Sequence, residues 1–385
     1  MQFLELTENE FDNACNKIPV SSFCQSSSWA KIKKKTGWIS YFVGVKEDDK
    51  IIACALVLGK KIYLNKYIFY SPRGLLLDYK NEKLLKFFTD HIKTFLKSKG
   101  GIILKIDPLI MYKHHDNSGN YVSDGFSNQG IIDNLVKLGF EHNGFTKDIL
   151  EDTQFRWSYC LDVDKPMEEI LKGMNQRARR CIRKCEKYPL KVVDVNKDNI
   201  KDFKDIMQHT AERQNRFDRS LEYYQRMKDE FGDRVKMILI YLDRDKFLSD
   251  FTNDKLFNTV KNEKRNKIPI SAGLFVFDPD RLNYLYGGTY SHYMHLMAQY
   301  KLQMSMINAC REKNLPIYDF GGISGDFNEQ NPMYGVFEFK RGFGGYVVEY
   351  IGEFTYVFNK LSYSMYNIAY KLYRTINHIR FKMSN

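Results

Sequence analysis

One lysine set among aromatic residues is the group in this sequence best suited to chemistry. Lys340 follows Phe339 in a run of aromatic and charged residues, after a loop rich in asparagine, glycine and proline. Before that loop, a β-rich segment at 317–320 ends at Gly321 and Gly322. This order can place one cation at a shaped, poorly hydrated site, where a fixed donor stabilises negative charge on a substrate oxygen better than in water. The competing interpretation is a strand, a turn and a surface lysine.

The elements that must position this lysine follow an order that occurs twice in the chain. In the first half, β-rich runs at 39–45 and 51–59 are separated by a polar turn, which is a hairpin signature. A third β-rich run lies at 67–70, a helical pattern of apolar residues at 81–98, and a buried strand at 102–106. The predicted order is hairpin, strand, helix, strand.

The second half repeats this order. Its β-rich runs lie at 237–242, 270–277 and 282–286, an amphipathic helical pattern lies at 293–311, and the strand at 317–320 follows. Internal similarity on this scale indicates a duplicated domain. Each half resembles the acetyltransferase-like (GNAT-like) unit, in which helices flank a mixed sheet.

The predicted fold class is therefore α/β, with two tandem GNAT-like domains and mixed sheets. We expect the first domain to span 1–151 and to be joined by the C-terminal segment 346–385. The second domain should span 152–345. Within it, the charged segment 243–267 carries apolar residues at roughly helical spacing and predicts a short helical arm.

Composition indicates a chain that can bury a large core. With 385 residues, 43% of them hydrophobic, it is long enough for two domains. It has no run of about 18 apolar residues, and its first residues lack the basic-then-apolar order of a signal peptide. We therefore expect a cytoplasmic protein.

Charge points to an anionic partner. The formal net charge is +12, which favours nucleic acid, a phosphorylated substrate or an acidic membrane surface without choosing among them. The seven cysteines include no Cys-x-x-Cys pair, and no histidines lie at metal spacing, so we expect reduced, mostly buried thiols, no metal and no cofactor. Cys181 and Cys185 should pack with Ala178 on one helix face.

A series of short motifs resembles the Fem family of peptidoglycan-bridge aminoacyltransferases over nearly the whole chain. None is specific alone, but their order and spacing are. They are Gln25-Ser26-Ser27-Ser28-Trp29-Ala30-Lys31, Leu104-Lys105-Ile106-Asp107-Pro108, 174–187, Arg219-Ser220-Leu221-Glu222-Tyr223, Pro269-Ile270-Ser271-Ala272-Gly273, Tyr284-Leu285-Tyr286-Gly287-Gly288-Thr289, Tyr318-Asp319-Phe320-Gly321-Gly322, Phe339-Lys340 and Glu349-Tyr350-Ile351-Gly352-Glu353.

The resemblance implies a function and a set of site residues. Members of this family move an amino acid from aminoacyl-tRNA to the stem peptide of a cell-wall precursor. The implied precursor-binding residues are Lys31, Arg219, Tyr223, Tyr284, Tyr286, Phe339 and Lys340, with Asp107 near the reacting amine. Lysines and arginine suit phosphates or carboxylates, and tyrosines suit sugar or peptide surfaces. For each residue the competing interpretation is a structural role, such as strand packing or, for Asp107, a strand end.

A basic helix is the candidate tRNA contact. The pattern at 175–187 places four basic residues on one stripe opposite the small apolar face. They are Arg177, Arg180, Lys184 and Lys187. Such a stripe suits a phosphate backbone, although a solvated charged face is the alternative. Several family members carry a long helical hairpin where this chain has only 243–267, so more of the tRNA contact must come from other basic surface.

The C-terminal segment predicts a second amphipathic helix. After Phe354 the chain has no acidic residue, and six apolar residues recur at spacings of three and four. They are Leu361, Met365, Ile368, Leu372, Ile376 and Ile379, accompanied by Lys360, Lys371, Arg374, Arg380 and Lys382. The helix either docks on the first domain or lies on the anionic inner membrane surface, as a lipid-linked substrate would favour.

The function predicted from these features is aminoacyl transfer from tRNA to the stem-peptide amine of a peptidoglycan precursor. Lys340 is the candidate for oxyanion stabilisation, and Asp107 for positioning the amine or acting as a weak base. The alternatives are an acyl-CoA-dependent N-acyltransferase, which needs a glycine-rich pyrophosphate loop opening a helix, and a non-catalytic RNA-binding protein. The sequence does not indicate which amino acid is transferred, the acceptor side chain, a lipid or nucleotide carrier, or the oligomeric state.

Overall fold

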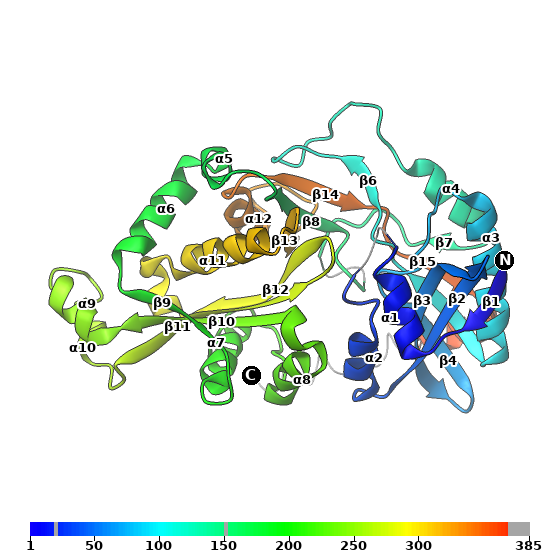
Figure 1. The fold of residues 1–385 in the computed structure, drawn as a ribbon, viewed down its shortest axis with the longest axis horizontal. Helices are drawn as coiled ribbons and strands as arrows, with labels where there is room; N and C mark the ends of the chain where they lie inside the picture. Colours follow the sequence, from blue (N-terminus) through cyan, green and yellow to red (C-terminus); the bar gives the residue numbers. More distant parts are fainter. Residues whose placement is uncertain (19–21, 150–152, 369–385) are drawn as a thin grey trace.

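A computed structural model describes residues 1–18, 22–149 and 153–368, and these form two mixed α/β sheets beside each other (Figure 1). The seven-stranded sheet has the order β1 (Gln2–Glu5), β2 (Trp38–Glu47), β3 (Lys50–Tyr63), β4 (Lys66–Ser71), β5 (Gly101–Ile106), β15 (Phe354–Val357) and β7 (Glu141–His142). The eight-stranded sheet has the order β6 (Met111–His114), β14 (Tyr346–Tyr350), β8 (Trp157–Asp162), β13 (Ile317–Gly322), β12 (Arg281–Thr289), β11 (Lys267–Phe277), β10 (Val235–Asp243) and β9 (Leu190–Asp194).

The repeated order predicted from the sequence is confirmed by the strand pairing. In the first sheet β2, β3 and β4 pair antiparallel, and α3 (Glu82–Ser98) then crosses to β5, which is parallel to β4. In the second sheet β10, β11 and β12 pair antiparallel, and α11 (Ala298–Glu312) crosses to the parallel strand β13. Both crossings are helices because parallel neighbours need a long connection between their opposite ends.

The sequence of α3 explains both where the helix begins and which of its faces is buried. The Asn81 side chain accepts a hydrogen bond from the Leu84 backbone N–H at 3.0 Å and caps α3. The apolar residues of α3 at three- and four-residue spacing, including Phe88 and Ile92, are buried against the first sheet. Removing a core side chain as large as Phe88 costs about 3–5 kcal/mol in comparable cores.

The expected domain division differs from the strand pairing at two places. The segment 346–385, expected to join the first domain, gives β14 to the second sheet and β15 to the first. In addition, β6, from within the expected first domain, pairs with β14 in the second sheet. The chain therefore crosses between the sheets more often than the repeat alone predicts, and a division near 152 remains a proposal.

The segment 243–267 contains two short helices, α9 (Arg244–Asp250) and α10 (Phe257–Lys261), at the outer end of the second sheet (Figure 1). Phe247 and Val260 from these helices are fully buried in the second core. Asp254, between the helices, accepts a hydrogen bond from the Tyr188 hydroxyl at 2.8 Å. This bond ties the segment to the end of α6 (Gln176–Lys187).

The second sheet opens between its two parallel strands. The pairing of β12 with β13 runs only from Arg281 opposite Ile317 to Asn283 opposite Asp319, although β12 continues to Thr289 and β13 to Gly322. Because side chains alternate across a strand, the cores formed with α11 on one side and α7 (Ile200–Arg213) on the other lie on opposite faces of the sheet. Figure 1 shows α11 and α7 on the two sides of these strands. The gap therefore connects one face to the other.

Within the part of the chain that the structure describes, no helix has the length and apolar character needed to span a bilayer.

Candidate active site

A cavity of about 1210 Å³ occupies the gap between β12 and β13. Its central lining is Tyr284, Gly287 and Gly288 from β12 and Phe320 and Gly322 from β13. The two strands stop pairing after Asn283 and Asp319, and their divergence creates this space.

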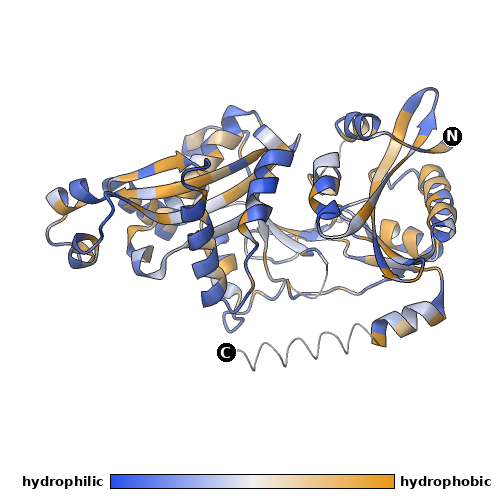
Figure 2. Ribbon diagram, turned by 90° about the horizontal axis from the view of Figure 1, so that it is seen from below, coloured by the Kyte–Doolittle hydropathy of each residue, from blue (hydrophilic) through white to orange (hydrophobic). Residues whose placement is uncertain are grey.

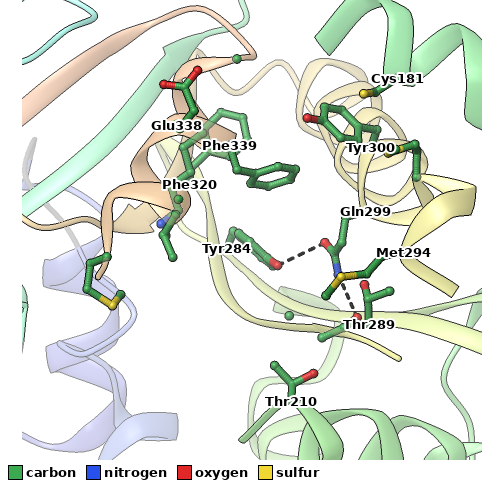
Figure 3. Close-up of a pocket in the computed structure, with 18 of the residues that line it drawn as sticks. Cys181, Thr210, Tyr284, Thr289, Met294, Gln299, Tyr300, Phe320, Glu338 and Phe339 are labelled. Carbon is green, nitrogen blue, oxygen red and sulfur yellow. Dashed lines mark hydrogen bonds between the residues drawn. The ribbon is translucent and has the colours of Figure 1, made fainter. Parts of the chain in front are cut away.

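The cavity extends to both faces of the sheet. On the α11 face it is lined by Arg177 and Arg180 of α6 and by Tyr300 near the start of α11. On the other face it is lined by Thr210 and Arg213 at the end of α7. In Figure 3, Thr210 and Tyr300 lie on opposite sides of the cavity, with Tyr284 and Gln299 between them. Two substrates can therefore meet in the gap after entering from opposite faces.

A glycine makes room for the tyrosine at the centre. A side chain at Gly287 would place its Cβ 1.6 Å from the Tyr284 hydroxyl oxygen. The Tyr284 hydroxyl donates a hydrogen bond to Gln299 Oε1 at 3.4 Å (Figure 3). Gln299 Nε2 in turn donates to Gly288 O and to Ser271 Oγ, both at 2.8 Å. Tyr284 thus lies in the cavity, as its place in the motif predicts, and its hydroxyl group faces a fixed acceptor.

Lys340 lies in the gap at the end of β13. It belongs to α12 (Tyr334–Arg341), is 6% exposed, and donates hydrogen bonds from Nζ to Gly321 O at 2.9 Å and Gly322 O at 2.7 Å. Burial lowers the pKa of Lys340 to about 7, and the Asp319 carboxylate acts in the opposite direction. An ammonium has three donors, so one remains for a ligand in the cavity that Lys340 lines.

Phe339 covers the adjacent wall. Its ring lies 5.2 Å from the Tyr300 ring and 5.4 Å from the Phe343 ring, centroid to centroid. Figure 3 shows Phe339 extending from α12 toward α11 across the cavity. These rings keep water from one side of the site.

Arg219, Tyr223 and Tyr286 form a separate cluster that does not line the cavity. Arg219 precedes α8 (Leu221–Phe231), and its guanidinium lies 5.4 Å from the centre of the Tyr223 ring. The Tyr223 and Tyr286 hydroxyl oxygens are 3.2 Å apart. Tyr286 raises the pKa of Arg219, so its guanidinium stays charged. The structure therefore places the predicted residues in two neighbouring groups, one in the gap and one near α8.

Lys31 does not face this cluster, whereas Lys33 does. Lys31, in α2 (Ser27–Lys34), is exposed and lies 3.2 Å from a Glu8 carboxylate oxygen. The Lys33 ammonium lies 4.8 Å from the centre of the Trp29 ring. Burial lowers the pKa of Lys33, and the Arg219 charge acts in the same direction. Residues two apart project from nearly opposite sides of a helix, so Lys31 and Lys33 meet different charges: Glu8 and Glu230 for Lys31, and Arg219 for Lys33. Lys33 follows Trp29 by four residues, about one helical turn, and this spacing could have identified it from the sequence.

Asp107 lies behind the cavity wall. It is 3% exposed and accepts hydrogen bonds from the Tyr70 hydroxyl at 2.8 Å and the Arg73 backbone N–H at 2.6 Å. Burial raises its pKa to about 7. The Arg73 guanidinium stacks 4.7 Å from the centre of the Phe155 ring, which lines the cavity. Arg73 and Phe155 thus separate Asp107 from the cavity, which it does not line.

The stripe on α6 faces the cavity over most of its length. Arg177, Arg180 and Lys184 line the cavity, while Lys187 is exposed beyond it. The small apolar residues Ala178, Cys181 and Cys185 are buried as predicted, although Cys181 borders the stripe and also lines the cavity. Lys184 Nζ lies 3.0 Å from His295 Nδ1.

Two further arginines, which the sequence reasoning missed, make the cavity strongly basic. Arg213 and Arg216 join the wall at the end of α7, and the sole acid among the described lining residues is Glu338. Arg341 Nη2 lies 2.6 Å from a carboxylate oxygen of Glu338 and offsets its charge. The cavity therefore favours an anionic ligand.

The described residues provide no group of three His, Cys, Asp or Glu side chains suited to a metal ion. The seven cysteines are buried and free of disulfides. Residues 290–297, which precede α11 beside the cavity, contain no glycine. Glycines let a backbone approach a pyrophosphate closely. The segment before α11 thus lacks the composition that a CoA pyrophosphate loop needs.

The two mixed sheets have the tandem arrangement predicted from the sequence, and the second sheet opens between its parallel strands. The chain belongs to the FemAB family, whose model matches residues 6–263 and 253–371. It is 30% identical to the aminoacyltransferase FemA of Staphylococcus epidermidis, over 97% of this chain and 100% of the relative. Identity to Staphylococcus aureus FemA is also 30%, covering 97% and 99%.

A solved structure shares the whole architecture. The crystal structure of FemX superposes with a TM-score of 0.82 at 25% identity, covering 95% of this chain and 99% of FemX. The resemblance inferred from the motifs is thus confirmed, and the predicted fold class with it.

Proposed function

We propose that this chain is an aminoacyltransferase that moves an amino acid from aminoacyl-tRNA to the stem-peptide amine of a peptidoglycan precursor, building the interpeptide bridge. This proposal depends mainly on one observation: the basic cavity in the second sheet, with the buried Lys340 in the gap between β12 and β13. FemAB membership and the aminoacyltransferase names of the FemA relatives support this proposal.

The reaction joins an amine to an activated ester. The amine nitrogen attacks the ester carbonyl carbon, and the resulting tetrahedral intermediate carries negative charge on the former carbonyl oxygen. Collapse breaks the bond to the 3′ oxygen of the tRNA, which receives the proton that the amine loses. Lys340 donates its remaining N–H to the oxyanion, because its other two bonds are held by Gly321 and Gly322.

The two faces of the sheet suit two different substrates. We assign the tRNA to the α6 face, where the stripe Arg177, Arg180, Lys184 and Lys187 begins in the cavity and continues beyond it. We assign the precursor to the face with α7 and α8, near Arg219, Tyr223 and Tyr286. On this assignment Lys33 replaces Lys31 as the lysine of the precursor site, and Asp107 supports the wall through Arg73 without touching the amine.

The helix at residues 360–368 supports the proposal of a membrane contact. Residues 360–368 are helical, and Leu361, Met365 and Ile368 are 74%, 57% and 62% exposed on one face. Figure 2 shows this helix projecting below the first domain. The apolar residues from Leu372 and the basic residues from Lys371 lie outside the described residues. We propose that this helix lies on the anionic cytoplasmic membrane surface. Equal sedimentation with anionic and neutral vesicles would contradict this.

The function is tested by product mass spectrometry. Purified protein is incubated with a charged tRNA pool and with precursor on a nucleotide or on a lipid carrier. The proposal predicts a precursor heavier by one amino-acid residue, lost on ribonuclease treatment of the donor. Modification of the precursor by acyl-CoA would favour an acyl-CoA-dependent N-acyltransferase. RNA binding without any product would favour a non-catalytic RNA-binding protein.

A further inference from the structure

Asp319 lies in the Tyr318-Asp319-Phe320-Gly321-Gly322 motif, where the pairing of β12 with β13 ends. We propose that Asp319 is the positioning residue for Lys340: it fixes the turn whose two carbonyl groups hold the ammonium, and it supplies the negative charge that keeps this buried lysine cationic. The proposal rests on the proposed function of Lys340 and adds a second residue to the same site.

The Asp319 carboxylate is buried and bonded to the turn. It is 4% exposed, and its Oδ1 accepts hydrogen bonds from the Ser158 hydroxyl at 2.5 Å and from the Gly321 backbone N–H at 2.7 Å. Gly321 has φ +75°, and a Cβ there would lie 2.8 Å from Tyr284 O. The side chain of Asp319 therefore holds a left-handed glycine at the point where β12 and β13 part.

The turn needs such support because the sheet holds it from only one side, through β8. Pairing with β12 ends at Asp319, and the register with β8 shifts between Asp319 and Gly322. The carbonyl groups of Gly321 and Gly322 are thereby free to accept the two Lys340 hydrogen bonds. Pairing with β8 resumes at Gly322 opposite Ser158, so the bond from Gly321 N–H to Asp319 fixes the turn between the two paired segments.

The charge of Asp319 serves the same lysine. Lys340 Nζ donates to two backbone carbonyl groups, no ion pair to a carboxylate is found for it among the described residues, and burial opposes its charged form. Asp319 and Cys160 act to raise the pKa of Lys340. Three ionisable groups surround Asp319. The Arg281 Nη1 atom lies 3.9 Å from Asp319 Oδ2, and the Cys160 thiol and the Tyr350 hydroxyl also interact with its charge. Asp319 is thus the acid placed to compensate the buried ammonium.

The test separates charge from geometry. Asp319→Asn keeps an oxygen that can accept both hydrogen bonds but removes the charge, whereas Asp319→Ala removes both. Losing an opposite charge in a buried site shifts a pKa by about one unit or more. For Asp319→Asn we expect the pH at which turnover falls to move down by about one unit. Single-turnover rates above that pH should fall about tenfold, with little change in KM for either substrate.

Two readouts keep this test independent of folding and of the proposed function. The 15N shift of Lys340 Nζ, titrated without substrates and assigned by its loss in Lys340→Met, should show the same downward pKa change. Asp162→Asn, on β8, removes an exposed acid from the same sheet and should leave the titration unmoved.

The outcomes are distinguishable. An unchanged Lys340 titration in folded Asp319→Asn overturns the positioning role but leaves the proposed function standing. If the wild type transfers no amino acid while the titration shifts as expected, the proposed function fails instead. Should Asp319→Ala not fold, Asp319→Asn carries the test alone because it retains the turn.

Discussion

Replacing Lys340 by methionine should reduce turnover about a hundredfold while leaving tRNA binding nearly unchanged. Two backbone carbonyl groups hold the ammonium at the end of β13, and methionine keeps the length of the side chain without its donors. Loss of one oxyanion-stabilising donor costs about 3 kcal/mol. The variant also leaves the Gly321 and Gly322 carbonyls without their partner, which costs about 1–3 kcal/mol of stability.

The pKa of Lys340 also predicts how turnover changes with pH. The pKa of Lys340 is lowered from 10.5 to about 7, so the active ammonium is lost as pH rises through about 7. Turnover should therefore decline above that pH. The free energy of unfolding should instead increase as pH rises from about 7 to 10.5. In this range the unfolded lysine still binds the proton that the folded lysine has released, and stability rises with pH wherever the unfolded state binds more protons. A decline in rate without a decline in melting temperature identifies the titration of Lys340.

The assay is single-turnover transfer at pH 6 and pH 8 with saturating tRNA and precursor. Lys313→Met is the matched control, because Lys313 lies outside the cavity at the end of α11 and over the Phe277 ring. A Lys340→Met rate within about twofold of the wild type at pH 6 would refute the oxyanion role.

Three further variants test the assignment of the two faces. Arg219→Lys should raise the KM for the precursor about tenfold, because lysine cannot reproduce a two-bond contact with a phosphate or carboxylate; unchanged precursor titrations would contradict this. Lys33→Met should weaken precursor binding more than Lys31→Met, and equal effects would remove Lys33 from the site. Changing the four stripe residues to glutamine should flatten the salt dependence of tRNA affinity by roughly 0.7–0.9 in log–log slope for each lost phosphate contact, and parallel slopes would mean a solvated face. The stripe residues are Arg177, Arg180, Lys184 and Lys187.

The elements with strong periodicity were predictable because local sequence determines them. The helix at 81–98 and the buried face of α6 follow directly from apolar spacing. The gap in the second sheet was not predictable, since Tyr284 and Phe320 lie on strands that read as ordinary β-rich runs. Only the end of the pairing after Asn283 reveals it.

Which residues line the cavity was predictable from the sequence only in part. Motif order led to Phe339, Lys340 and Tyr284, which line the cavity. Asp107, in contrast, does not line the cavity, and a strand-end aspartate looks the same in a sequence whether it faces a ligand or, as here, the Arg73 backbone. Motif order missed Arg213 because no motif marks the end of α7, and only the packing of that helix on the sheet brings its guanidinium to the cavity.

The gap through the second sheet also bears on how products leave. If each substrate has its own face, the spent tRNA and the lengthened precursor withdraw in opposite directions and neither has to pass the other. Each product then competes for the entrance of its own substrate alone. A molecule that blocks the precursor face would leave the protein able to hold charged tRNA, whereas one that fills the gap beside Lys340 would exclude the reacting ends of both.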